Sequence, residues 1–66
     1  MKKLDKLKGR IKEKGSSYKI LSNALGISLS AFNNKVNGRS AFDIIEASEL
    51  SSILDIPPEE ISNFFA

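Results

Sequence analysis

Apolar residues recur along this chain at spacings of three and four, and almost nowhere do they alternate with polar residues. The first spacing is typical of a helix that buries one face, whereas alternation is typical of a strand. The pattern therefore predicts an all-α fold with five helices and no convincing strand. The expected helices cover residues 2–14, 18–25, 29–36 and 43–54, with a fifth beginning at residue 58.

The residues at the expected helix ends support these boundaries. Ser17 and Ser28 are suited to cap the second and third helices, and Asp43 with Glu46 three residues later has the spacing of a capping box. Asn37-Gly38 offers a left-handed stop, and Ile56-Pro57-Pro58 breaks the fourth helix. Within the first helix Gly9 is a weak point, which indicates either close approach of another helix or a tolerated imperfection.

One apolar face of each helix predicts the core. The residues expected to be buried are Leu4, Leu7, Ile11, Ile20, Leu21, Ala24, Leu25, Phe32, Val36, Ala47, Leu50, Ile53 and Leu54. Three apolar residues fall outside these faces: Ile45, Phe64 and Phe65. They suggest a dimer surface, with ordinary packing at the edge of the core as the alternative.

Residues 17–38 hold two short helices separated by only a few residues, so the helices must cross steeply and the second can project from the domain. On the second helix, Leu29, Phe32 and Val36 share one face. Another face is lined by Ser30, Asn33, Asn34 and Asn37. Serine and asparagine disfavour helix, so their presence on an outer face indicates a use other than helix stability.

Asparagine can present a donor and an acceptor together to adenine in the major groove of DNA. The residues expected to contact bases are Leu29, Ser30, Asn33 and Asn34, although solvated polar filler is the alternative for the asparagines and Leu29 could instead close the core. The residues expected near the DNA backbone are Ser17, Tyr18, Lys19, Lys35, Asn37, Arg39 and Ser40. Asn37 fits a cap or a backbone contact better than a base contact.

Charge divides the chain into two parts. The net charge is +2, but residues 1–40 hold all ten bases and have a net charge of +8, whereas residues 41–66 hold six acids and no base. A positive end of this kind can displace counterions from phosphates. Because the chain lacks cysteine and histidine, we expect no enzyme, metal, cofactor or small-molecule ligand. No apolar run approaches the about 20 residues that span a bilayer, so we expect a cytoplasmic protein without membrane contact.

Three segments resemble the lambda-repressor-like helix-turn-helix family, specifically the small Cro and repressor proteins of temperate phages. They are LSNALGIS at 21–28, SAFNNKVNG at 30–38 and LSSILDIPPEEISNFF at 50–65. The resemblance implies a five-helix DNA-binding domain over residues 1–66 whose second motif helix enters the major groove. It also implies that Leu29, Ser30, Asn33 and Asn34 face bases and that Asn37 and Arg39 face the backbone. The sequence departs from the family pattern at Tyr18, Leu29 and Lys35.

The expected function is a homodimeric, Cro-like transcriptional repressor that binds a pseudo-palindromic operator in double-stranded DNA. The chain has no room for a separate oligomerisation domain, which favours a short regulator over a two-domain repressor. One alternative is a protein-interaction module, antirepressor or antitoxin-like, that uses Ile45, Phe64 and Phe65. Another is a basic helix over residues 2–14 that binds RNA or a membrane surface.

Overall fold

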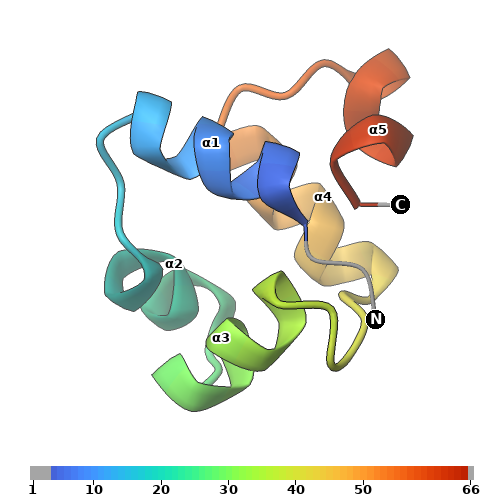
Figure 1. Ribbon diagram of the computed structural model, residues 1–66. Helices are drawn as coiled ribbons and strands as arrows, with labels where there is room; N and C mark the ends of the chain where they lie inside the picture. Colours follow the sequence, from blue (N-terminus) through green and yellow to red (C-terminus); the bar gives the residue numbers. More distant parts are fainter. Residues whose placement is uncertain (1–3, 66) are drawn as a thin grey trace.

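The computed structural model of the protein describes residues 4–65, and these residues form a small all-helical fold without strands (Figure 1). The elements are α1 (Asp5–Glu13), α2 (Tyr18–Leu25), α3 (Leu29–Val36), α4 (Ile44–Ile53), a 3-10 turn η1 (Pro58–Glu60) and α5 (Ile61–Phe65). The predicted all-α class is therefore confirmed. Lys2 and Lys3, expected in the first helix, lie outside the described residues. No helix among the described residues is long and apolar enough to cross a membrane.

The predicted helix caps are present. The Ser17 hydroxyl accepts a hydrogen bond of 3.2 Å from the backbone N–H three residues later, and the Ser28 hydroxyl does the same at 3.0 Å. Asp43 and Glu46 form a reciprocal capping box, with bonds of 2.7 and 3.0 Å. Each cap satisfies an N–H that the first turn of a helix leaves without a partner. The starts of α2, α3 and α4 are therefore determined by local chemistry.

Left-handed residues end the helices. Gly26 follows α2 with φ 71°, and Gly38 lies beyond α3 with φ 81°. After α4, Asp55 adopts the same left-handed conformation, with φ 54°. A side chain in this region costs about 1–2 kcal/mol, and aspartate is among the residues that tolerate it best. The end of α4 is therefore a strained position that other contacts must hold.

Two cations of the α1 region hold that position. The Arg10 guanidinium donates to the carbonyl oxygens of Leu54 (2.9 Å) and Asp55 (2.7 Å), and the Lys14 ammonium bonds to the Asp55 carboxylate at 2.9 Å. The hydrogen bond and charge of Lys14, with a smaller effect of Arg10, lower the pKa of Asp55. The stabilisation from this carboxylate is therefore present above its unfolded pKa and is lost as pH falls through the lower folded pKa.

The core joins all five helices. Its buried apolar residues are Leu7, Ile11, Leu21, Phe32, Val36, Leu50, Leu54, Ile56 and Phe64. Phe32 is completely buried, and its ring lies 5.3 Å from that of Tyr18 and 5.8 Å from that of Phe42. Phe42 in turn meets Phe65 edge-on at 5.4 Å. One chain of aromatic rings thus connects α2, α3, the loop after α3 and α5.

Some residues expected in the core are exposed. Ile20 is 59% exposed, Ile53 is 43% exposed, and Ala24 also faces outwards, so these three predictions are wrong. The packed faces of α2 and α4 instead include the buried serines Ser22 and Ser51. Each hydroxyl donates to a carbonyl of its own helix, at 2.9 and 2.7 Å, so burial leaves neither of the two hydroxyls without a partner. The hydrophobic pattern alone does not mark such serines as inward-facing.

The expected dimer surface is only partly available. Phe64 is buried in the core, with the Lys6 ammonium 5.0 Å from the centre of its ring, and Phe65 is half-buried against Phe42. The two adjacent phenylalanines pack on different neighbours, which lets both be covered. The burial of Phe64 therefore fits the alternative of ordinary packing and not a dimer surface, whereas Phe65 stays partly exposed. Ile45 stays exposed.

Gly9 is an imperfection of α1 that can be repaired. A Cβ placed there would meet no heavy atom within 4 Å among its surroundings, so close helix packing does not explain the glycine. We expect Gly9→Ala to raise the free energy of unfolding in urea by about 1 kcal/mol, since alanine favours helix. The control is Gly26→Ala, where φ is 71° and the same change should lower stability by about 1 kcal/mol. Equal effects of the two substitutions would contradict this interpretation.

Candidate nucleic-acid interface

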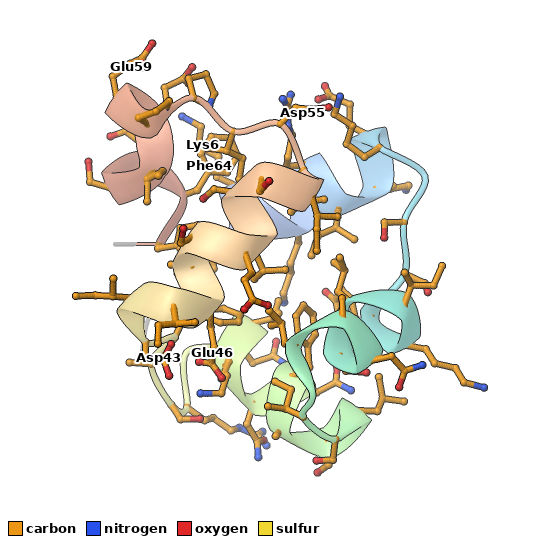
Figure 2. All side chains as sticks on the ribbon, turned by 180° about the vertical axis from the view of Figure 1, so that it is seen from behind. Lys6, Asp43, Glu46, Asp55, Glu59 and Phe64 are labelled. Carbon is orange, nitrogen blue, oxygen red and sulfur yellow. The ribbon has the colours of Figure 1, made fainter. Side chains whose placement is uncertain are left out.

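The two helices α2 and α3 are joined by residues 26–28 and pack against each other at one end of the molecule (Figure 1). The acidic residues Asp55 and Glu59 lie at the opposite end (Figure 2). Asp43 and Glu46 lie closer to α3, but both are used in the cap of α4. The carboxylates at the far end therefore do not shield α3 from a negatively charged partner.

The two faces of α3 differ as predicted. Phe32 and Val36 are completely buried, whereas Ser30 is exposed and Asn33 and Asn34 are partly exposed. Among the hydrogen bonds of the described residues, none uses the side chain of Asn34. The Asn33 amide donates a long, exposed bond of 3.2 Å to the Leu29 carbonyl. Asn34 thus presents a donor and an acceptor to the surroundings, whereas the Asn33 amide is partly used within α3.

The sequence left open whether Leu29 closes the core or faces outwards. The side chain is 45% exposed, so it faces outwards. It lies in the first turn of α3 and does not close the core. Ile20, on α2, is a second exposed apolar residue of this helix pair. The surface of α2 and α3 therefore combines amides with apolar side chains.

Asn37 is used internally. Its carbonyl oxygen accepts a bond of 2.8 Å from the Lys8 ammonium, and its amide nitrogen donates to the Asn33 carbonyl at 2.8 Å. The Leu4 N–H also donates to the Val36 carbonyl at 3.1 Å. These bonds close the end of α3 and connect it to α1. Asn37 therefore has the cap role that the sequence favoured.

Lys35 has a structural role that sequence analysis missed. Its ammonium donates to the Ala41 carbonyl at 2.9 Å and to the Glu46 carboxylate at 3.0 Å, and it lies 5.8 Å from the centre of the Phe42 ring. Its side chain is only 17% exposed. The ammonium holds the loop after α3 against the capping box of α4, so its donors are directed into the protein. This use disfavours the expected contact with a DNA backbone.

The other residues expected near the DNA backbone are exposed or partly exposed. Ser17, Lys19, Arg39 and Ser40 are exposed at the start of α2 and just after α3. Tyr18 is half-buried against Phe32, and burial raises the pKa of its phenol. The phenol therefore stays protonated near neutral pH and can donate a hydrogen bond. These residues flank the exposed stripe of α3 in the sequence.

Outside this helix pair the described residues offer little chemistry. None of their acidic side chains form a group of three that could hold a metal ion. An open hollow of about 390 Å³ lies along α1 and α5, lined by Lys6, Gly9, Arg10, Glu13 and Phe64. The Arg10 guanidinium already bonds to Glu13 and to the end of α4, and the Lys6 ammonium lies over the Phe64 ring. The hollow is therefore held together by internal contacts.

A family model described as "Protein of unknown function (DUF739)" matches residues 3–66. No curated protein and no solved structure matches the chain. The family description assigns no activity, so any functional interpretation depends on the geometry of the chain itself.

Proposed function

The chain belongs to the DUF739 family, and we propose that it is a sequence-specific DNA-binding regulator with a helix-turn-helix motif at residues 17–38. The observation that supports this most directly is the stripe of Ser30, Asn33 and Asn34 on the solvent side of α3. The major groove of B-DNA is wide enough for one α-helix, and an asparagine amide can bond to the N6 and N7 atoms of adenine. Asn34, whose side chain takes part in none of the hydrogen bonds among the described residues, is the principal reader in this proposal.

Backbone contacts come from both sides of the stripe. Ser17, Tyr18 and Lys19 lie at the start of α2, where free N–H groups also favour a phosphate. Arg39 and Ser40 follow α3 on the other side. Lys35 and Asn37 are left out because their polar atoms bond within the protein. The excess of Lys and Arg over Asp and Glu in residues 1–40 supplies the long-range attraction to DNA.

The finer proposal is a lambda-repressor-like, Cro-type repressor that acts on the bacterial chromosome or a phage genome in the cytoplasm. Two copies bind a pseudo-palindromic operator, with one α3 in each half-site and half-sites about 34 Å apart. The alternative of a protein-interaction module used Ile45, Phe64 and Phe65. Because Phe64 is buried in the core and Phe65 packs partly against Phe42, only Ile45 of these three is fully exposed, and we favour the DNA-binding function.

Selection of bound duplexes from random DNA at fixed salt tests this function. We expect enrichment of a two-fold symmetric sequence that contains adenines in each half, since the proposed readers are asparagines. Binding that shows no preference among duplexes would contradict sequence-specific regulation. Binding only to single-stranded nucleic acid would contradict the use of α3 in a major groove.

Removal of two cations near the end of α3, Lys35 and Arg39, should have different effects on stability and on DNA binding. Lys35→Met should lower the free energy of unfolding by about 1–2 kcal/mol, because it leaves the Glu46 carboxylate without its ammonium partner. Arg39→Met should change stability by less than about 0.5 kcal/mol, since Arg39 is exposed. It should, however, lower the slope of log affinity against log salt by about one. Urea unfolding and a salt titration of DNA binding measure the two effects, and a reversed pattern would contradict these roles.

Leu29 should recognise the methyl group of thymine. We expect replacement of one thymine per half-site by deoxyuridine to weaken wild-type binding about fourfold, because one buried methyl is worth about 0.8 kcal/mol. Leu29→Ala should bind the two duplexes more nearly alike. Binding titrations of both proteins with both duplexes measure this, and equal discrimination by wild type and variant would contradict it.

A further inference from the structure

A row of hydrogen bonds follows one edge of α3. The Asn33 side-chain amide donates to the Leu29 carbonyl at 3.2 Å, and the Asn37 side-chain amide donates to the Asn33 carbonyl at 2.8 Å. These residues are four apart, so each lies about one turn further along the helix. The Asn37 side-chain oxygen then accepts a bond of 2.8 Å from the Lys8 ammonium of α1. The row therefore connects the first turn of α3 to a different helix.

The backbone of α1 also meets the end of α3. The start of α1 lies beside the end of α3 (Figure 1), and the Leu4 N–H donates to the Val36 carbonyl at 3.1 Å. The carbonyls of residues 34 and 35 accept from the N–H groups of Arg39 and Gly38. Carbonyls in the last turn of a helix have no partner within the helix itself. At Val36 that partner comes from α1, so contact with α1 is part of how α3 ends.

We propose that Lys8 is a positioning residue for base recognition. Through Asn37 it holds the end of α3 against α1 and so fixes the direction in which α3 enters the major groove. The inference rests on the proposed function, because it concerns how accurately Ser30 and Asn34 are presented to the bases. It gives a lysine of α1 a role other than general attraction to phosphates.

The two ends of α3 are attached in different ways. Residues 26–28 join its start directly to α2, and the Ser28 hydroxyl caps its first turn. Its other end is followed by the longer loop 37–43 and depends on side chains that reach other helices. Lys35 joins this end to α4, and Lys8 joins it to α1. Without Lys8 the end of α3 loses its side-chain attachment to α1, although the buried Phe32 and Val36 still hold the helix on the core.

The chemistry of the bond between Lys8 and Asn37 suits this role. The C-terminal end of a helix has a partial negative charge, which a nearby ammonium stabilises. A hydrogen bond with a charged donor is also about twice as strong as one between neutral groups. Both residues are half-buried, so water competes less for the bond than at an open surface. Recognition needs such support, because a reading side chain must be held within about 0.5 Å of its place.

Lys8→Met in the full chain tests the role, because methionine keeps an apolar stem and removes the donor. Lys12→Met is the control, since Lys12 is exposed on the same helix and the substitution removes the same charge. Affinity is measured for the selected duplex and for duplexes altered at each adenine in turn. The ratio of the affinities for selected and altered duplexes is the readout. Lost charge or partial unfolding weakens binding to all of these duplexes equally and leaves the ratio unchanged.

We expect Lys8→Met to lower this ratio by about threefold or more at one adenine per half-site. Lys12→Met should lower the affinities but keep the ratio. Lys8→Arg, which retains a donor, should restore it. Asn37→Ala removes the acceptor and should lower the ratio as Lys8→Met does. Because both residues act through one bond, the double variant should lose no more than Asn37→Ala alone.

Three results would overturn the inference. An unchanged ratio in Lys8→Met and Asn37→Ala would do so while leaving base recognition by α3 intact. An equal fall in the ratio for Lys12→Met would make lost charge the cause and would also exclude positioning by Lys8. If no duplex is selected at all, the proposed function fails, and the role of Lys8 in recognition fails with it.

Discussion

Phe32→Ala should lower the free energy of unfolding by about 3–5 kcal/mol, the usual cost of emptying the space of a buried phenylalanine. The ring is completely buried and lies between those of Tyr18 and Phe42. Phe42 continues the contact to Phe65, so the substitution removes a link between α2, α3 and α5. A chain of 66 residues has only a small core, and a loss of this size approaches its entire stability.

Circular dichroism during urea unfolding measures this loss, and we expect most Phe32→Ala molecules to be unfolded without denaturant at about 25 °C. Phe65→Ala is the control, because Phe65 is half-buried at the far end of the same series of rings. It should cost clearly less and leave a cooperative transition. A Phe32→Ala protein that keeps a cooperative transition and loses less than about 1 kcal/mol would show that the core is organised around other residues.

The features that the sequence predicted well depend on neighbours in the chain. Ser17, Ser28 and the pair Asp43 and Glu46 cap helices through contacts three residues apart. The residue types and their spacing in the sequence are therefore enough to predict these caps. The buried stripe of Phe32 and Val36 was also predicted correctly. Such contacts need no knowledge of how the helices are arranged.

The errors concern which face of a helix meets another helix. Ile20, Ala24 and Ile53 were expected inside and are exposed, because the packed faces of α2 and α4 are turned towards Ser22 and Ser51. Periodicity indicates that one face is apolar but does not fix its angle when a short helix has apolar residues on two sides. Serines that bond to their own helix are invisible to such a pattern.

Parts of the candidate interface depend on distant contacts for the same reason. Lys35 meets Glu46 eleven residues away, and Asn37 meets Lys8 twenty-nine residues away. Arg10 supports the end of α4 from a distance of more than forty residues, although its sequence context is that of a solvated lysine-rich helix. A cation on an exposed-looking face therefore gives no indication of whether it serves a partner or the fold.

Asn34→Ala should have the largest effect on the proposed binding activity. We expect a loss of about 1–3 kcal/mol per half-site on the selected sequence, about fivefold to 150-fold in affinity, because the amide can form two bonds to one adenine. Binding to random duplexes should change little. The preference for one base per half-site should therefore disappear, and titrations against duplexes altered at each position measure it.

The interpretation of this variant is direct because Asn34 contributes little to the fold. Its side chain makes none of the hydrogen bonds among the described residues, and alanine favours helix more than asparagine does. Stability should therefore stay the same or rise slightly, so that lost binding cannot be attributed to unfolding. Asn63→Ala, at an exposed asparagine of α5, is the control and should leave binding unchanged. If Asn34→Ala weakened binding to selected and random duplexes equally, Asn34 would be a backbone contact, and base recognition would fall to Leu29, Ser30 and Asn33.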